Sequence, residues 1–287
     1  RMLKTLTTSM TLNTSKISLQ MLKEYPVAEG VLAFSTMRKG GVSLGNYSEF
    51  NINEYCGDSS EHIWENRRLL AERLGVSADH IVMPHQVHGI EVRRVDGEFF
   101  SKPEPVRKMI LEGVDALITD LRGVCIGVST ADCIPVLLYD EVHHAMAAIH
   151  AGWRGTVQRI VQKTIEMMCT SFHTRPSELK AVIGPGISKE AFEVGDEVYE
   201  EFVQGGFDMP AIADQRPNMK KEGNVDQPMK WHIDLPLCNS LLLQESGIPA
   251  VHIHQSGICT YQHSDDFFSA RRLGIQSGRI FTGIILF

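Results

Sequence analysis

The sequence lacks the features that mark several large classes of protein. Among its 287 residues, no stretch approaches the ~20 consecutive apolar residues of a membrane-spanning helix. Residues 1–20 are rich in Thr and Ser and have no apolar core, so we expect no secretory signal there. The loop at Gly40-Gly41 has neither the Lys-Ser/Thr ending of a phosphate-binding loop nor a GxGxxG pattern. The sequence therefore predicts neither a membrane protein nor a dinucleotide cofactor.

An excess of positive charge is also missing. The chain has 28 Lys and Arg residues against 35 Asp and Glu residues, a formal net charge of -7 and a pI of about 5.9. Dedicated nucleic-acid-binding domains usually carry a basic face, so we expect no nucleic acid partner. A small anionic substrate held by a few local arginines stays open. Apolar residues make up 43% of the chain and charged residues 22%, which is typical of a globular protein with a sizeable core.

The six cysteines do not form a CxxC pair or a short repeating pattern. In a chain of this length, such spacing indicates reduced thiols and not a disulfide framework. We therefore expect a cytoplasmic protein. Each cysteine, taken alone, could equally serve as a small buried apolar residue of the core.

The hydrophobic pattern predicts one mixed α/β domain. Short apolar runs broken by turn residues predict strands at residues 31–36, 114–119, 124–129, 135–139, 145–150, 181–183, 251–254 and 279–286. Capped amphipathic stretches predict helices at residues 60–74, 156–169 and 235–245. Near-continuous apolar strands imply a sheet covered on both faces. We place the domain at residues 26–287, after an N-terminal extension at residues 1–25.

Residues 205–230 interrupt this pattern. The segment is polar and contains Pro210, Pro217 and Pro228. Strand signals resume after it, so we interpret it as a long surface excursion within the domain and not as a linker.

Three polar clusters lie at the expected strand ends, where α/β proteins usually place their sites. They are residues 84–89 (PHQVHG), 129–135 (STADCIP) and 150–155 (HAGWRG). His88, Cys133 and His150, one from each cluster, offer two imidazoles and one thiolate. These are preferred ligands of Zn²⁺, and three protein ligands leave a fourth position for water or substrate.

The chemistry of these three residues leaves alternatives open. Their separations, 45 and 17 residues, match no local metal-binding pattern. They could be hydrogen-bonded core histidines beside an inert buried thiol. Cys133 could also be a nucleophile activated by His150. His85 lies three residues before His88 in an expected extended segment, so the two side chains should point to opposite faces. We therefore expect His85 to lie behind the ligands or at the surface.

Asp132 and four arginines are the other candidates. Asp132, next to Cys133, could orient a ligand, transfer protons to or from a substrate, or form a local turn. Arg38 lies in the glycine-rich loop and Arg154 in the third cluster, while Arg271 and Arg272 form a pair near the C-terminus. Guanidinium groups at such positions suit an anion such as phosphate, although each alone could belong to a surface ion pair.

Taken together, these motifs resemble the YfiH-like family. Its members have been labelled multicopper polyphenol oxidases or laccase-domain proteins, and are described as zinc-dependent enzymes of purine nucleosides. The resemblance extends over about residues 30–286. It rests on the segments FST (34–36), GGVS (40–43), QVHG (86–89), VDAL (114–117), TADCIP (130–135), HAGWRG (150–155), IGP (183–185), FEVG (192–195), FSARR (268–272) and GR (278–279).

The resemblance implies a layered α/β/β/α domain and a zinc site at His88, Cys133 and His150. It also implies a purine nucleoside phosphorylase acting on adenosine, inosine and guanosine, with adenosine deaminase and S-methyl-5'-thioadenosine phosphorylase activities. Purine nucleosides and phosphate are then the expected partners. Gly186 departs from the family, which commonly has Cys after Gly-Pro.

Within this interpretation we assign roles to the remaining candidates. Asp132, Arg154 and Arg38 are assigned to catalysis. Substrate binding is assigned to three further residues, Gln86, Arg271 and Arg272.

Three other functions remain as alternatives. The family also suggests a peptidoglycan editing factor that hydrolyses an amide in a muramyl peptide precursor. Copper-dependent polyphenol oxidation is another, but multicopper oxidases need more histidine ligands than one three-residue site provides. The third is a non-catalytic binding module with a structural metal. A fourth protein ligand, such as His85 or Cys259, would favour that module.

Overall fold

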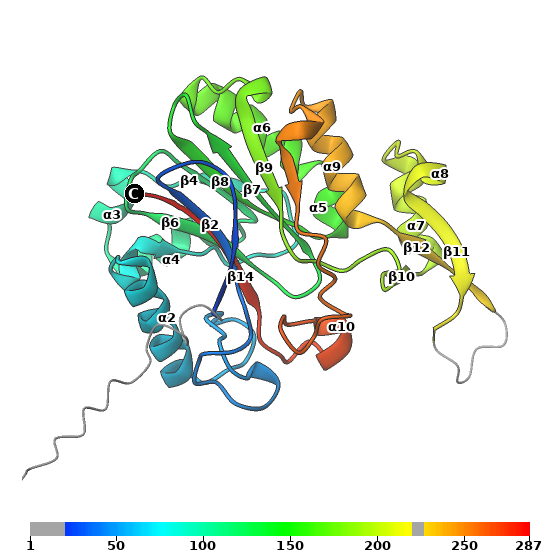
Figure 1. The fold of residues 1–287 in the computed structure, drawn as a ribbon, viewed down its shortest axis with the longest axis horizontal. Coiled ribbons are helices and arrows are strands. Elements are labelled where there is room, and N and C mark those ends of the chain that lie inside the picture. The colour runs from blue at the N-terminus through cyan, green and yellow to red at the C-terminus, as the bar shows by residue number, and fades with distance from the viewer. Residues whose placement is uncertain (1–20, 220–226) are drawn as a thin grey trace, which may run out of the picture.

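Two large β-sheets stacked face to face form the body of the molecule (Figure 1). The computed structural model describes residues 21–219 and 227–287. The first sheet contains, in spatial order, β1 (Leu22–Tyr25), β2 (Val31–Thr36), β14 (Ile280–Leu286), β6 (Cys125–Thr130) and β3 (Ile81–Val82). The second contains β13 (Ile253–Gln255), β9 (Leu179–Ile183), β7 (Ile134–Asp140), β8 (Ala145–Ala151), β5 (Ala116–Thr119) and β4 (Val92–Arg94).

Side-chain alternation along the strands divides the core into layers. In β7, Leu137 and Tyr139 point between the sheets, where they meet Ile126 and Ile284 of the first sheet. Alternate residues of β7, such as Val136, point to the outer face of the second sheet. Both faces of each strand are therefore apolar, which is why the strands read as continuous apolar runs.

Helices cover the two outer faces. The helices α6 (Ile160–Phe172) and α9 (Leu235–Glu245) pack on the second sheet, and α2 (Ser60–Leu74) packs on the first. The layers are thus helix, sheet, sheet and helix, which confirms the expected α/β/β/α architecture of a mixed α/β domain (Figure 1).

Local sequence explains where the main helices begin and end. Gly75 ends α2 in a left-handed conformation with φ 71°, as its position after Leu74 predicts. Asp234 caps α9 by accepting a hydrogen bond from the backbone of Leu237. The helix expected at residues 156–169 is instead two helices, α5 (Trp153–Val157) and α6, because Arg159 between them has φ 64°.

The N-terminal boundary is earlier than the sequence indicates. Residues 22–25, placed in the N-terminal extension, form β1 and pair with β2 at the edge of the first sheet. Residues 1–20 lie outside the described part of the chain. In the C-terminal half, residues 250–252 form a 3-10 helix, so the closing strand expected at 251–254 is reduced to β13.

The expected surface excursion is more ordered than its composition suggests. Its described part contains α8 (Met209–Ile212) and β11 (Ala213–Pro217), and it leads into β12 (Met229–Ile233). These strands join β10 (Glu193–Val194) in a small third sheet beside α7 (Asp196–Gln204), to one side of the two large sheets (Figure 1). Residues 220–226 lie outside the described part.

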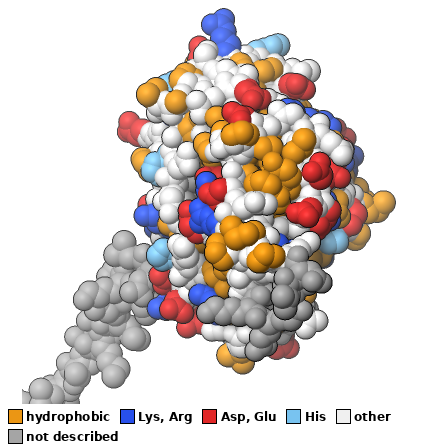
Figure 2. All heavy atoms as spheres, turned by 90° about the vertical axis from the view of Figure 1, so that its right-hand side faces the viewer, with side chains coloured by type: hydrophobic (Ala, Val, Ile, Leu, Met, Phe, Trp, Pro, Cys, Tyr) orange, Lys and Arg blue, Asp and Glu red, His pale blue; other side chains and the backbone are white. Residues whose placement is uncertain are grey.

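The remaining elements are short. They are α3 (Gly97–Ser101), α4 (Glu104–Ile110), α10 (Ala270–Leu273) and the 3-10 helices η1 (Gly45–Tyr47), η2 (Ala78–His80), η3 (Pro176–Glu178) and η4 (Ala250–His252). Within the described residues, no helix has the length and apolarity needed to cross a membrane. Figure 2 shows the face that carries the small sheet, where acidic and basic side chains are interspersed among apolar ones.

Candidate metal centre

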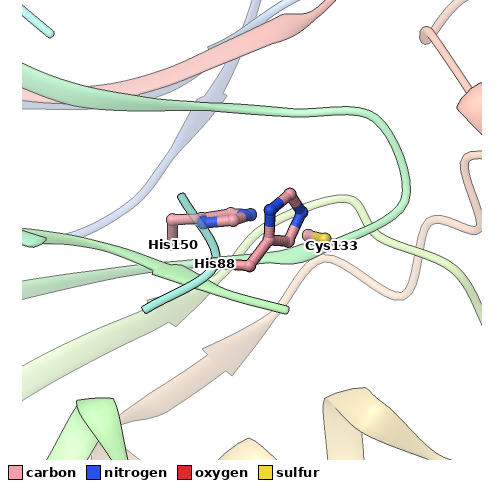
Figure 3. A group of neighbouring side chains, drawn as sticks. All are labelled: His88, Cys133 and His150. Atoms are coloured by element: carbon pink, nitrogen blue, oxygen red, sulfur yellow. The ribbon is translucent and has the colours of Figure 1, made fainter. Parts of the chain in front are cut away.

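His88, Cys133 and His150 lie together at one end of β7 and β8, two central strands of the second sheet. His88 lies in the loop between β3 and β4, Cys133 directly precedes β7, and His150 lies near the end of β8. The ligand atoms of these side chains all lie within 4.8 Å of one another (Figure 3). Among the described residues, no fourth His, Cys, Asp or Glu joins this group.

Sheet register explains the meeting of Cys133 and His150. The strands β7 and β8 are antiparallel, with Pro135 opposite His150 and Ile134 opposite Ala151. Cys133 therefore lies one step beyond this pairing. Because side chains alternate along a strand, Cys133 and His150 lie on the same face of the sheet, the one that faces the other sheet.

Glycine at position 152 keeps a side chain away from the three candidate ligands. A Cβ atom on Gly152 would lie 3.1 Å from both Cys133 Sγ and His88 Cδ2. The rings of His88 and His150 meet edge to face, with centroids 4.8 Å apart. Two imidazoles and a thiolate around a small gap fit the ligand set and open fourth position of a catalytic zinc site.

A buried carboxylate, Asp115, supports both histidines. Its Oδ1 atom lies 2.7 Å from His150 Nδ1, and the backbone N–H groups of Val87, His88 and Gly89 donate hydrogen bonds to its two oxygens over 2.9–3.2 Å. With Nδ1 of His150 engaged, Nε2 is the atom that remains for Cys133 or a metal. His88 has φ 60°, so the loop that carries it is held in a conformation rare for a non-glycine residue.

The metal-free cluster favours a thiolate beside an imidazolium. Burial alone would raise the pKa of the Cys133 thiol, but His150 and His88 outweigh this and lower the pKa to about 6. Burial would lower the pKa of His150, but Cys133 and Asp115 raise it to about 9. For Asp115, burial opposes ionisation, yet the hydrogen bonds from His150 and from the backbone of Gly89 and Val87 lower its pKa.

Asp132 lies beside this cluster with both carboxylate oxygens engaged. Oδ1 accepts a 2.7 Å hydrogen bond from Thr260 Oγ1, and Oδ2 accepts one of 2.7 Å from the backbone N–H of Arg271. Its φ of 101° departs further from ordinary geometry than that of His88. Asp132 therefore joins the Cys133 segment to residues 260 and 271, which fits a positioning role and leaves proton transfer as a prediction.

The two arginines assigned to catalysis differ in their surroundings. Arg154 is exposed, and its guanidinium stacks on the ring of Trp153 at 4.3 Å and has no hydrogen-bond partner among the described residues. Arg38 is partly buried and donates to the backbone carbonyls of Ser48 and Ser264, at 2.9 and 2.6 Å. Arg154 is thus free to bind an anion, whereas two donors of Arg38 are already used within the protein.

The residues assigned to substrate binding also have protein contacts. The amide of Gln86 bonds both the N–H and the carbonyl of Ser129, each at 2.7 Å, so both of its polar ends are occupied. Arg271 donates to the backbone carbonyl of Glu193, and Arg272 stacks on Tyr261. Both arginines are exposed and retain further donors.

The two residues considered as a fourth ligand have other partners. His85 Nδ1 lies 2.8 Å from the carboxylate of Glu112, and its ring stacks on Tyr55. Cys259 is buried, and its sulfur accepts a hydrogen bond from the backbone of Ser188. Gly186 lies against the Cys133 segment, since an added Cβ would lie 3.1 Å from the Asp132 carbonyl oxygen. Neither His85 nor Cys259 therefore supplies a fourth protein ligand within the described part of the chain.

Sequence reasoning did not assign a role to Asp115 or Thr260. Asp115 belongs to the VDAL motif, which carries the family resemblance. It is the single charged residue of the apolar segment at residues 114–119. That isolation is a signal that could have pointed to it, because a buried carboxylate needs specific partners. No sequence pattern connects Thr260 with Asp132, which lies 128 residues earlier.

Comparison with known proteins places the chain among relatives along nearly its whole length. A family model described as multi-copper polyphenol oxidoreductase laccase matches residues 32–287. A purine nucleoside phosphorylase of Bacteroides thetaiotaomicron is 46% identical over 253 residues, which cover 88% of this chain and 90% of that protein. Adenosine deaminase RL5, from an unknown prokaryote, is 42% identical, with 93% of this chain and 98% of that protein covered.

Solved structures agree in fold. The YfiH protein of Bacillus licheniformis superposes with a TM-score of 0.79 and 28% identity, covering 90% of this chain and 93% of that one. YlmD of Geobacillus stearothermophilus gives a TM-score of 0.77 and 30% identity, covering 91% and 94%.

The ionisation of Cys133 can be tested on protein stripped of metal with a chelator. Because only the thiolate reacts with iodoacetamide, we expect alkylation of Cys133 to be half-maximal at about pH 6 and to fall below it. Cys169 serves as an internal control, since burial raises the pKa of its thiol and its rate should still rise in alkaline solution. Peptide mass spectrometry would measure both rates. A Cys133 midpoint as alkaline as that of Cys169 would contradict the prediction.

Proposed function

This chain belongs to the YfiH-like, laccase-domain family, and we propose that it is a zinc-dependent purine nucleoside phosphorylase. We further propose that it deaminates adenosine and cleaves S-methyl-5'-thioadenosine with phosphate. The observation that carries the proposal is the open cluster of His88, Cys133 and His150. The relatives named purine nucleoside phosphorylase and adenosine deaminase support the substrate class.

In this proposal His88, Cys133 and His150 hold the zinc ion. A zinc ion bound there would lower the pKa of a water molecule and so supply a nucleophile near neutral pH. Asp115 accepts a hydrogen bond from His150 Nδ1, which would leave the lone pair of Nε2 available to the ion. Gly152 would keep a side chain from crowding an ion held by Cys133 and His88.

Asp132 is proposed to transfer protons in deamination. Water adds to the purine carbon that bears the amino group, and ammonia leaves after it has gained a proton. A carboxylate beside that carbon can take the proton from the attacking water and deliver it to the leaving nitrogen. The hydrogen bonds from Thr260 and from the backbone of Arg271 would fix Asp132 in this position.

Arg154 is proposed to hold phosphate in phosphorolysis. A phosphate oxygen attacks the anomeric carbon of ribose, the bond to the purine breaks, and the base leaves with a proton. Arg154 suits this dianion because its guanidinium has no hydrogen-bond partner within the described protein. The exposed Arg271 and Arg272 are proposed to bind substrate, and a direct role for Gln86 remains a prediction, since Ser129 occupies both polar ends of its amide. A direct role for Arg38 remains a prediction, since it donates to two backbone carbonyls.

A second candidate is hydrolysis of an amide in a muramyl peptide precursor. One observation favours it: Asp115, His150 and Cys133 form a carboxylate–imidazole–thiol series, with Asp115 Oδ1 2.7 Å from His150. Such a series activates a cysteine nucleophile toward carbonyl carbon. Copper-dependent phenol oxidation, which the family description suggests, is less favoured, because one three-ligand site lacks the additional histidines of multicopper oxidases.

Metal analysis and product analysis on one preparation would separate these functions. We expect stoichiometric zinc, free adenine or hypoxanthine from adenosine only when phosphate is present, and inosine without it. Cys133→Ala should lose the metal and all these activities together, whereas Cys169→Ala, a half-buried thiol on α6, should keep both. Stoichiometric zinc of unchanged affinity in Cys133→Ala would refute the ligand assignment. Turnover of the muramyl peptide alone would favour the second candidate.

Arg154→Lys should separate phosphorolysis from deamination. Lysine keeps the charge but loses the planar pair of donors, so we expect phosphorolysis to fall about ten- to hundredfold. Deamination needs no phosphate and should change little. Arg94→Lys is the matched control, since Arg94 stacks on Phe172 much as Arg154 stacks on Trp153 but has no role in the proposed site, so neither reaction should change. Initial rates at saturating nucleoside and varied phosphate would measure the difference. Equal losses in both reactions would mean that Arg154 does not act through phosphate.

Asp132→Asn tests proton transfer by that carboxylate. Asparagine cannot take up the proton, so we expect deamination to fall about 10²–10⁴-fold while zinc remains bound. Thr260→Val is the control, because it removes one hydrogen bond to Asp132 and leaves the carboxylate in place. Zinc content, melting temperature and initial rate should be measured for both variants. Matching losses of rate would indicate that Asp132 only positions the Cys133 segment.

A further inference from the structure

Asp115 is surrounded on every side by donors from elements that carry metal ligands. It is fully buried, and its carboxylate accepts from three consecutive backbone N–H groups of the His88 loop and from the ring of His150. Its own backbone is held as well. The N–H group donates to the Glu91 carbonyl, and the carbonyl accepts from the N–H of His150.

This arrangement fixes two histidines by two different means. Three N–H groups pointing at one carboxylate form an anion-binding nest, which holds residues 87–89 in the turn that gives His88 its φ of 60°. For His150, the short contact to Nδ1 selects the tautomer with a proton on Nδ1, since an ionised carboxylate only accepts. One side chain therefore sets the position of His88 and the tautomer of His150.

We infer that Asp115 is the positioning residue that preorganises both histidines for the metal. It does not touch the metal or substrate in this role, and the inference rests on the zinc site of the proposed function. Asparagine at this position presents one acceptor and one donor. If the NH₂ group faced residues 87–89, it would meet their N–H groups and could not accept from them. If it faced His150, it could not accept a hydrogen bond from that ring. One histidine is therefore released in either orientation.

A second buried carboxylate in the same chain provides a matched control. Asp140 is also fully buried, and it accepts from the backbone N–H groups of Val142 and His143, from His143 Nδ1 and from Thr174 Oγ1. It thus has the same burial and four similar donors, including an imidazole. His143 is not part of the metal cluster.

The experiment compares Asp115→Asn with Asp140→Asn in the full chain. Both should lower the melting temperature, because each leaves donors around a buried amide. Only Asp115→Asn should weaken Zn²⁺ binding, by about 10–100-fold in competition with a chromophoric chelator. Co²⁺ loaded into the same proteins provides a spectroscopic signature: the thiolate charge-transfer and d–d bands should change in Asp115→Asn and remain native in Asp140→Asn. Native Zn²⁺ affinity and native Co²⁺ bands in Asp115→Asn would overturn the inference.

A measurement on the unsubstituted protein covers the case in which Asp115→Asn fails to fold. In ¹⁵N-histidine spectra of the zinc-loaded chain, with His150 assigned by its loss in His150→Gln, the ring should carry its proton on Nδ1. A proton on Nε2 would overturn the inference. The proposed function fails separately, if the unsubstituted chain binds Zn²⁺ but turns over no nucleoside. A chain that binds no Zn²⁺ overturns both.

Discussion

The need to compensate one buried negative charge shapes this end of the molecule. A carboxylate removed from water is strongly destabilising unless donors surround it, and the donors of Asp115 come from the His88 loop and from β8. The loop satisfies the charge by turning back on itself at His88. The ring of His150 satisfies it by presenting Nδ1. The same hydrogen bonds therefore compensate the charge and set the geometry of the cluster.

Most strands, the main helices and the candidate ligand residues could be identified in the sequence because their signals are local, whereas the layered arrangement was implied by the family resemblance. Apolar runs mark strands such as β7 and β8 whose two faces are both buried, and Gly75 marks the end of α2. Imidazole and thiol groups at strand ends suggest a metal by their chemistry alone. Their meeting within 4.8 Å depends on the pairing of β7 with β8, which no single segment encodes.

Features that depend on distant partners could not be predicted. The small sheet of β10, β11 and β12 forms from short polar strands, whose pattern resembles that of a surface loop. The break between α5 and α6 arises at Arg159, a residue type with no strong preference for a left-handed conformation. The partners of Gln86 and Asp132 lie 43 and 128 residues away, so their hydrogen bonds became visible only in the folded chain.

The position of the cluster at the end of the β7–β8 pair also makes it depend on the fold around it. Two ligands become neighbours only when these strands pair, and the third arrives when its loop closes on Asp115 at the start of β5. In the described residues, the apolar cores between the sheets and under the helices do not include His88, Cys133 or His150. In a zinc finger the ion supplies the folding energy, because the chain has no core without it. Here the apolar cores are formed by residues outside the cluster, so we expect a metal bound at the cluster to be removed or exchanged without unfolding the chain.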